Sequence, residues 1–255
     1  MKFGKLAELN NTGLVVTPKH EAWVRSVQEI VLSDEAITFT AEQLRAQANP
    51  RKREGSFSAS SLGSCLRSQQ FTFHGVEKPK IDSKSAGIFQ NGTYMHLRWQ
   101  AEGLTAHWLT AAEVPVPPNP YQLSGTMDGT IEDDGVLELK SANDRSFSSM
   151  LAFGPTNKYK LQGAAYLLAS NRRYVSFLIE NKNTQEYMER VLTRNDLPLK
   201  EAEERAQTLW HAEDSQHLLP VLDSVYEGKG ECAWCPFKEK CLDYKSYEDF
   251  DDQEG

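Results

Sequence analysis

Two carboxylates and a lysine lie close together in the middle of the chain: Asp128, and then Glu138 and Lys140 within Glu138-Leu139-Lys140. Glu138 and Lys140 are two residues apart in a stretch with strand character, so both side chains leave the same face. Asp128 lies on the other arm of the expected hairpin and can meet them there. Paired carboxylates repel unless a cation neutralises them. Mg²⁺ or Mn²⁺ prefers such oxygen ligands, and Lys140 could then orient or activate a water.

The alternative for these charges is a solvated strand face, because Asp followed by Glu-x-Lys is a common pattern by chance. The flanking residues Leu123, Val136 and Leu137 are apolar. They indicate buried strands, which a fully exposed face would not need, and they favour the interpretation as a site.

The four cysteines are unevenly placed. Cys65 stands alone, whereas Cys232, Cys235 and Cys241 form a C-x2-C-x5-C pattern. The residues that follow Met1 lack the apolar run of a secretory signal, so a reducing cytosol is the expected setting, and disulfides are disfavoured there. Metal ligation is therefore expected, by zinc or by an iron–sulfur cluster. Four unrelated buried thiols are the alternative.

The surrounding pattern is that of a mixed α/β protein, a central sheet with helices on its faces. Residues 85–108 are expected to form a helix with Ile88, Met95 and Trp99 along one face. Further helices are expected over 157–170 and from a cap at 195 or 196 to about 211. Strands are expected over 121–132, 136–141, 174–180 and 187–192, with the first two joined by a turn at Asp133-Asp134-Gly135.

Three regions are expected along the chain: an N-terminal helical extension over 1–55, a core over 56–245 and an acidic tail over 246–255. Thr40 and Gln43 are expected to form a capping box in the extension. The formal net charge of −8 is unfavourable for nucleic-acid binding, although basic residues cluster at Arg51-Lys52-Arg53, Arg67, Lys78 and Lys80. No apolar stretch is long enough to span a bilayer, so no membrane role is expected.

The order of these motifs resembles the RecB-type branch of the PD-(D/E)XK nucleases. The matching segments are Gly92-Thr93-Tyr94-Met95-His96, Leu123-Ser124-Gly125-Thr126-Met127-Asp128, Leu137-Glu138-Leu139-Lys140 and Gln162-Gly163-Ala164-Ala165-Tyr166. The sequence departs from the family pattern at Met127, which stands in place of the nominal proline. The resemblance implies a restriction-endonuclease-like fold, a mixed central sheet flanked by helices.

The resemblance also implies residue roles. His96, Asp128, Glu138 and the backbone carbonyl of Leu139 would hold the metal ion. Lys140 would be the catalytic lysine, and Gln162 and Tyr166 would contact DNA and position the site. The alternatives are an ordinary helix histidine for His96 and a polar edge of a core helix for the other two.

Ser58 to Arg67 resembles the first-cysteine segment of the iron–sulfur members, the CRISPR-associated adaptation nucleases and the nuclease domain of the AddB helicase subunit. This resemblance favours a [4Fe-4S] cluster over zinc on Cys65, Cys232, Cys235 and Cys241, with a structural role that joins the C-terminal segment to the start of the core.

The function that the resemblance implies is a Mg²⁺- or Mn²⁺-dependent DNA exonuclease acting on single-stranded or free-ended DNA. It would work in bacterial or phage recombination, replication or repair, in the cytoplasm, as a homo-oligomer or with a recombination partner. The alternatives are a non-catalytic cluster-stapled DNA-binding module and a CRISPR-adaptation nuclease. Arg67, Arg98, Tyr94 and Phe71 are candidate DNA contacts.

Overall fold

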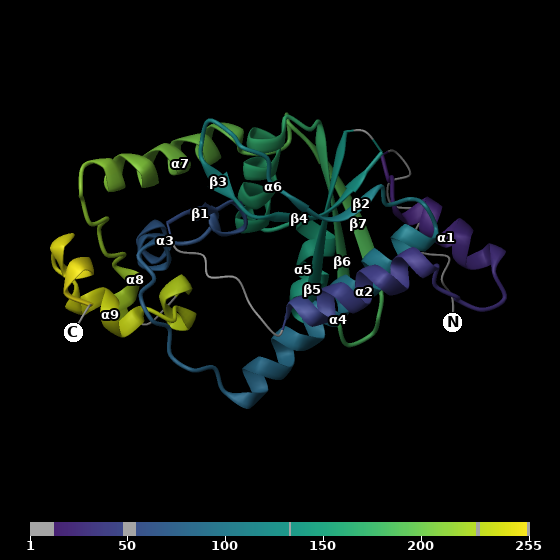
Figure 1. Ribbon diagram of the computed structural model, residues 1–255, viewed down its shortest axis with the longest axis horizontal. Coiled ribbons are helices and arrows are strands. Elements are labelled where there is room, and N and C mark those ends of the chain that lie inside the picture. The colour runs from purple at the N-terminus through teal and green to yellow at the C-terminus, as the bar shows by residue number, and fades with distance from the viewer. Residues whose placement is uncertain (1–12, 48–54, 133, 228–229, 254–255) are drawn as a thin grey trace.

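A mixed five-stranded sheet forms the centre of the molecule (Figure 1). The computed structural model describes residues 13–47, 55–132, 134–227 and 230–253. The strand order is β2-β4-β5-β6-β7, in which β5 and β6 are parallel and the other neighbours are antiparallel. The bounds are β2 (Ala111–Pro115), β4 (Thr126–Ile131), β5 (Gly135–Ala142), β6 (Tyr174–Asn181) and β7 (Tyr187–Thr193). Two short strands, β1 (Phe57–Ser58) and β3 (Leu123–Ser124), pair separately in parallel.

The two central strands are buried on both faces, because successive side chains point to opposite sides of the sheet. On β5, Val136 belongs to one hydrophobic cluster, and Leu137 and Leu139 belong to another. On β6, Phe177 and Leu178 divide in the same way. The sheet therefore separates two layers of apolar side chains, and each layer needs a cover of helices.

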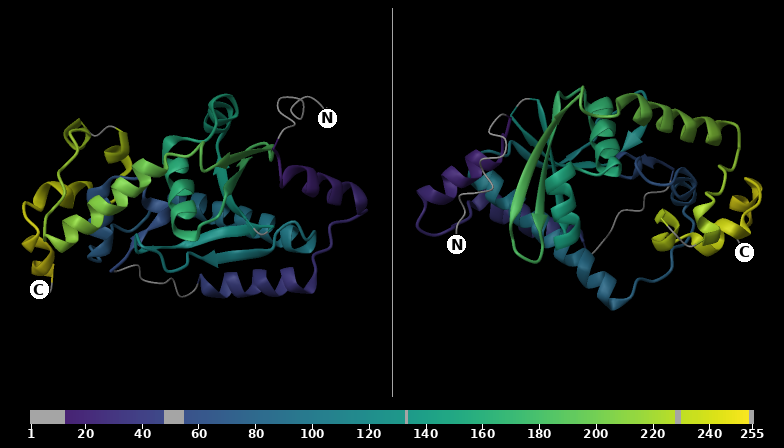
Figure 2. Two further views of the ribbon diagram at one scale, coloured as in Figure 1. Left: turned by 90° about the horizontal axis from the view of Figure 1, so that it is seen from above. Right: turned by 180° about the vertical axis from the view of Figure 1, so that it is seen from behind.

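Helices cover both faces (Figure 2). The long α4 (Ser83–Thr105) covers one face, together with α1 (Thr17–Ser26) and α2 (Asp34–Ala46). Ala36 and Phe39 of α2 join the Trp99 cluster, and the His20 ring of α1 lies 4.5 Å from the Trp99 ring. The other face is covered by α5 (Asp144–Phe153) and α6 (Asn157–Ser170), and α7 (Leu199–Asp214) packs on α6.

The C-terminal segment packs against α3 (Leu66–Phe73) at one end of the molecule. It consists of α8 (Ser224–Glu227), α9 (Lys238–Asp243) and the short 3₁₀ turns η2 (Gly230–Trp234) and η3 (Glu248–Gln253); a third 3₁₀ turn, η1 (Ala59–Ser61), precedes α3. Phe71 of α3 lies at the centre of this contact, beside Phe237 and Phe250. Arg67 donates hydrogen bonds to the backbone carbonyls of Cys241 and Tyr244 in this segment and of Leu219, which precedes it.

The predicted mixed α/β architecture is confirmed. The helix predicted over 157–170 is α6, and the one predicted over 85–108 is α4. Ile88 does not belong to the buried face of α4, since its side chain is 45% exposed. The four predicted strand regions correspond to β3 with β4, to β5, to β6 and to β7.

Several local predictions were wrong. The helix of the N-terminal region begins at Asp34 with Ser33 as its cap, so Thr40 is an internal residue whose hydroxyl donates to the Ala36 carbonyl. Helix α7 begins only at Leu199, because the Asp196 carboxylate accepts from Thr193 instead. Helix α5 was not predicted, and β2 lies within residues 109–142, a stretch expected to have strand character, although no separate strand was assigned there. Of the predicted hairpin turn, Asp133 lies outside the described residues.

No helix in the described part of the chain is both long and apolar enough to cross a membrane.

One buried carboxylate anchors the N-terminal helices to the sheet. Glu189 of β7 is 2% exposed. Its oxygens accept hydrogen bonds from the backbone N–H groups of Val15, Val16 and Thr17 at 2.8–3.1 Å, and from the Ser176 hydroxyl at 2.6 Å. A negative charge at this point also complements the N-terminus of α1.

We expect Glu189→Gln to lower the free energy of unfolding by about 2–3 kcal/mol, because a neutral amide with one acceptor oxygen replaces a charged group that serves four donors. Urea titration followed by circular dichroism measures the loss. Glu186→Gln, an exposed position in the same hairpin, is the matched control. Equal stability of the two variants would contradict the anchoring role.

Candidate active site

The predicted carboxylates meet where β4 and β5 diverge. Paired residues on these strands run only from Gly129–Leu137 to Ile131–Gly135. Beyond that point the backbone N–H of Leu139 donates to Asp128 Oδ2 at 2.6 Å. The side chain of Asp128 thus takes the place of a strand partner, and this fixes it beside Glu138.

Helices from both faces of the sheet supply the next contacts. His96 of α4 lies with its Nδ1 3.2 Å from Asp128 Oδ1. Gln162 of α6 donates from its Nε2 to Glu138 Oε1 at 2.6 Å, and its Oε1 accepts from Lys140 Nζ at 3.1 Å. Lys140 also forms an ion pair with Glu138. The structure therefore brings together His96, Asp128, Glu138, Lys140 and Gln162.

Tyr166 lies beneath this group and does not face solvent. Its ring is 1% exposed, its hydroxyl donates to the Thr126 carbonyl at 2.9 Å, and Gln162 donates to it at 3.1 Å. Contact of Tyr166 with a phosphate or a base, which the sequence analysis allowed, does not fit this burial. Its position suits a residue that holds Gln162 in place.

The two carboxyl groups differ in pKa. Burial raises the pKa of Glu138 to about 7, and the charge of Asp128 adds to the rise. Burial also acts to raise the pKa of Asp128, but His96 and Lys140 outweigh it and hold that pKa below its usual value. The pair therefore carries less negative charge at neutral pH than two ordinary carboxylates would.

The basic groups of the site remain charged more readily than usual. Burial acts to lower the pKa of Lys140, but Glu138 and Asp128 outweigh it and raise that pKa. Burial likewise acts to lower the pKa of His96, and Asp128 reverses the effect. Lys140 Nζ also lies 4.9 Å from the centre of the Tyr159 ring, where a cation is stabilised by the ring face.

The donor set fits a hard divalent cation in its chemistry. Glu138 Oε2 is buried and has no hydrogen-bond partner among the described residues. This carboxylate oxygen is therefore available to coordinate a cation. The negative charge of Asp128 helps to raise the pKa of Glu138, and a cation bound here would offset that charge. As the side chains lie, no three His, Cys, Asp or Glu residues in the described ranges converge in a way that could hold a metal ion.

A third carboxylate beside the site was missed by the sequence analysis. The register of β2 and β4 places Glu113 between the pairs Ala112–Gly129 and Val114–Met127, and therefore across from Asp128. Glu113 has a φ of 50°, and burial raises its pKa, with the Asp128 charge adding to the rise. No motif marks Glu113, because only the register of the sheet brings it here.

Gln100, one turn after His96 on α4, is the second residue that was missed. Its Nε2 donates to Glu113 Oε1 and to the Asp128 carbonyl, each at 2.8 Å. The side chain is 0% exposed. It therefore ties two carboxylate-bearing strands to the helix that carries His96.

The predicted DNA contacts do not all reach the surface. Arg67 and Phe71 are 4% and 0% exposed, and both support the packing of the C-terminal segment. Arg98 forms ion pairs with Glu180 and Glu102. Tyr94 is exposed. The basic triplet at 51–53 lies outside the described residues.

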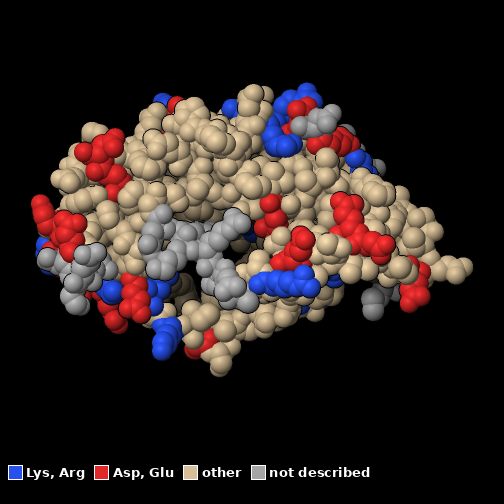
Figure 3. Space-filling view, viewed as in Figure 1, with Lys and Arg blue, Asp and Glu red and all other residues tan. Residues whose placement is uncertain are grey.

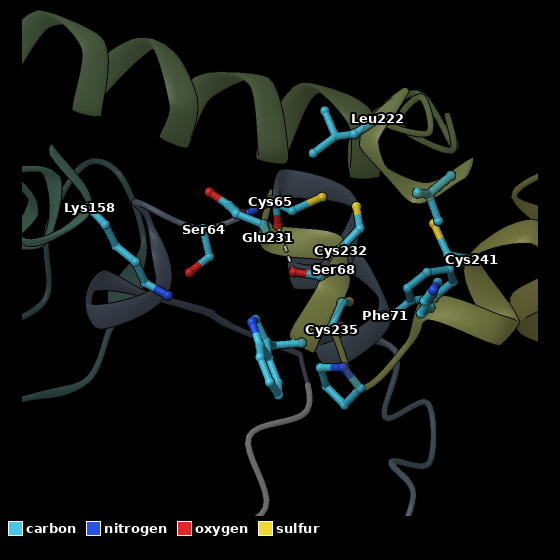
Figure 4. A pocket seen from close by; sticks show the side chains of 14 residues that line it. Ser64, Cys65, Ser68, Phe71, Lys158, Leu222, Glu231, Cys232, Cys235 and Cys241 are labelled. Atoms are coloured by element: carbon cyan, nitrogen blue, oxygen red, sulfur yellow. Dashed lines mark hydrogen bonds between the residues drawn. The ribbon is translucent and has the colours of Figure 1, made fainter. Parts of the chain in front are cut away.

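The four cysteines line one cavity near the start of α6. Cys65 precedes α3, Cys232 lies in η2, Cys235 follows it, and Cys241 lies in α9. Figure 4 shows their side chains extending from these segments toward a shared space. Burial raises the pKa of Cys65, and Cys241 and Cys235 add to the rise. The cavity lies between the beginning of the core and the C-terminal segment. As the side chains lie in the described part of the chain, no three of these cysteines converge closely enough to hold a metal ion.

The fold is shared with solved structures. LHK-Exo, an alkaline exonuclease from Laribacter hongkongensis whose structure contains dAMP, matches with a TM-score of 0.52 at 16% identity, over 63% of this chain and 89% of that one. The protein SSO0001 matches with a TM-score of 0.52 at 17% identity, over 84% and 98%. No protein-family model matches the sequence, and no curated protein is similar to it.

The raised pKa of Glu138 predicts a pH dependence of stability in EDTA. Its folded value of about 7 exceeds its unfolded value of roughly 4.3, so the folded state binds this proton more tightly. The resulting stabilisation is present below the unfolded pKa and is lost as the pH rises through about 7.

We therefore expect the urea midpoint of the wild-type protein to fall, relative to that of Glu138→Gln, as the pH rises from about 5 to 7.5. The substitution also changes hydrogen bonds to Gln162 and Lys140, so only the change of the difference with pH is informative. A difference that stays constant over this range would contradict the assignment.

Proposed function

We propose that the chain is a metal-dependent DNA exonuclease of the PD-(D/E)XK type. The observation that carries this proposal is the convergence of Asp128, Glu138 and Lys140 at the diverging ends of β4 and β5. The shared fold with an alkaline exonuclease supports it. Phosphodiester hydrolysis is the reaction that suits two acids and a lysine around a cation site.

Asp128, Glu138, His96 and the Leu139 carbonyl would hold Mg²⁺ or Mn²⁺. When bound, the cation supplies Lewis-acid stabilisation of charge on the phosphate. The ammonium group of Lys140, held by Glu138 and Gln162, is placed to orient the attacking water. The water oxygen forms the new bond to phosphorus and gives up a proton to solvent; the bond from phosphorus to a deoxyribose oxygen breaks, and that oxygen takes up a proton. Gln162, supported by Tyr166, keeps Lys140 and Glu138 aligned.

For the cysteines we propose a [4Fe-4S] cluster with a structural role. The four thiols line one cavity and come from both ends of the core. A ligated cluster would close a long loop of chain and so restrict the unfolded state. Zinc on the same thiols is the competing ligand, and metal analysis separates the two.

The proposed substrate is single-stranded or free-ended DNA, as in bacterial or phage recombination, replication or repair. A non-catalytic DNA-binding module would have no need of a buried Lys140 paired with Glu138 and Gln162. The cleavage experiment below distinguishes the two.

We expect Asp128→Asn, Glu138→Gln and Lys140→Ala each to reduce cleavage by a factor of about 10³ or more, because each removes a charge from the reacting centre. End-labelled single- and double-stranded DNA incubated with Mg²⁺, Mn²⁺ or EDTA measures cleavage, metal need and polarity together.

Asp134→Asn is the matched control, since Asp134 lies in the same hairpin and pairs with Arg173 at the surface. Full activity in the three site variants would refute the assigned site. Activity that persists undiminished in EDTA would refute the metal dependence.

Protein purified without oxygen is expected to be brown and to contain iron and acid-labile sulfide. Cys235→Ser should lose most of the visible absorbance and the iron. Ser224→Ala, which removes a hydroxyl 3.2 Å from Cys232 Sγ, should retain both the absorbance and the iron. A colourless protein with stoichiometric zinc would show that the cysteines bind zinc and not an iron–sulfur cluster. That result would not affect the proposed DNA cleavage.

A further inference from the structure

Two adjoining cavities lie where the C-terminal segment meets the core. The first, of about 300 Å³, is the cysteine cavity, and its lining includes Lys158, Trp234 and Lys238. The second, of about 490 Å³, lies between residues 77–80 and 235–240. Cys235, Pro236 and Lys238 line both, so the two cavities adjoin. We name the second cavity, together with the charged and aromatic residues that line the first, the basic groove; the space between the cysteines is left to the ligand proposed for them.

The charge of the basic groove opposes that of the chain. Its charged lining residues are five lysines and three glutamates: Lys78, Lys80, Lys158, Lys238, Lys240, Glu77, Glu231 and Glu239. The whole chain carries −8. Glu231 is engaged by the N–H of Cys65 at 2.7 Å. In Figure 3, Lys and Arg side chains, with Asp and Glu side chains among them, lie where the segment leading into α4 passes the C-terminal elements.

Trp234 lies at the edge of this surface with 91% of its side chain exposed. A large aromatic ring left in water gains nothing for the fold, and it offers a flat apolar face to a ligand. A ring of this kind among lysines is the combination that binds single-stranded nucleic acid: bases stack on the ring while ammonium groups contact phosphates. A protein partner would find a charged surface here, which interface centres avoid.

The basic groove is connected to the candidate active site through one turn of α6. Lys158, which lines the groove, lies four residues before Gln162 and so on the same helix face, about 6 Å along the axis. Gln162 contacts Glu138 and Lys140. Figure 4 shows the Lys158 side chain reaching from α6 toward the cysteine cavity. A strand that occupies the groove therefore lies within a few nucleotides of the reacting centre.

We propose that the basic groove binds single-stranded DNA, with Trp234 as the stacking platform for a base and with Lys78, Lys80 and Lys158 as phosphate contacts. This inference rests on the proposed function and names the part of the surface that selects an unpaired strand. Stacking requires an exposed base face, so a duplex gains only the lysine contacts at this surface.

The test is the affinity for a fluorescein-labelled oligothymidylate, measured by anisotropy in EDTA, where no cleavage is required. Trp234→Ala should weaken binding about 10-fold, whereas Trp234→Phe should retain most of the wild-type affinity, because the phenyl ring still stacks. Phe153→Ala is the matched control: Phe153 is 85% exposed and lines neither cavity.

The lysines are tested by salt dependence. The double variant Lys78→Glu with Lys80→Glu should weaken binding and reduce the salt slope by about one for each lysine. Lys200→Glu, whose side chain on α7 is 90% exposed, should change neither. Trp234→Ala should leave the salt slope as it is, because it removes stacking and no charge.

Binding of both groove variants within twofold of the wild type would overturn the proposal. An equal loss by Trp234→Ala on a blunt duplex would also overturn it, because stacking needs unpaired bases. The two proposals fail separately. If the wild-type protein cleaves DNA and the groove variants bind as well as it does, the nuclease proposal stands and the groove proposal is wrong. If the groove variants bind more weakly but the wild-type protein cleaves no DNA, the groove proposal stands and the nuclease proposal is wrong.

Discussion

The hydrogen bond from the Leu139 N–H to the Asp128 carboxylate is the contact on which the candidate site depends. Where β4 leaves β5, a backbone donor in the centre of the sheet loses its strand partner, and an unsatisfied buried N–H is costly. Asp128 satisfies that donor and is thereby fixed beside Glu138. The divergence of the strands also opens the sheet, so that His96 and Gln162, from opposite faces, reach the same pair of acids.

A close backbone contact couples this site to the cysteine cavity. A Cβ added at Gly63 would lie 2.5 Å from the Lys158 carbonyl oxygen, so the chain that leads to Cys65 lies directly against the first turn of α6. The same helix carries Gln162 one turn later. Whatever holds the cysteines together therefore also fixes the start of the helix that positions Glu138 and Lys140. A structural metal at the cysteines would act on catalysis through this helix, without contact to substrate.

Local patterns were enough to predict β5, which carries Glu138 and Lys140, and α6, which carries Gln162, because both are runs rich in apolar residues bounded by turn or cap residues. Prediction failed where the decisive interaction is not local. Thr40 has the spacing of a helix cap, but the tertiary contacts of α2 extend the helix past it in the N-terminal direction. Glu113 and Gln100 join the site only through strand register and helix packing. Arg67, a candidate DNA contact in the sequence, is buried and donates hydrogen bonds to carbonyls of residues far along the chain.

The net charge of −8 does not by itself argue against nucleic-acid binding, because what matters is where the charges lie on the surface. Binding is governed by the surface within about one Debye length of a phosphate, roughly 8–10 Å, and not by the sum over the chain. Many acids are already engaged: Glu189 by backbone N–H groups, Glu180 by Arg98, and Glu213 by His74. What remains beside the start of α6 is an excess of lysine. A basic groove on a chain of net charge −8 holds a polyanion along that groove, which suits an enzyme that must align one strand.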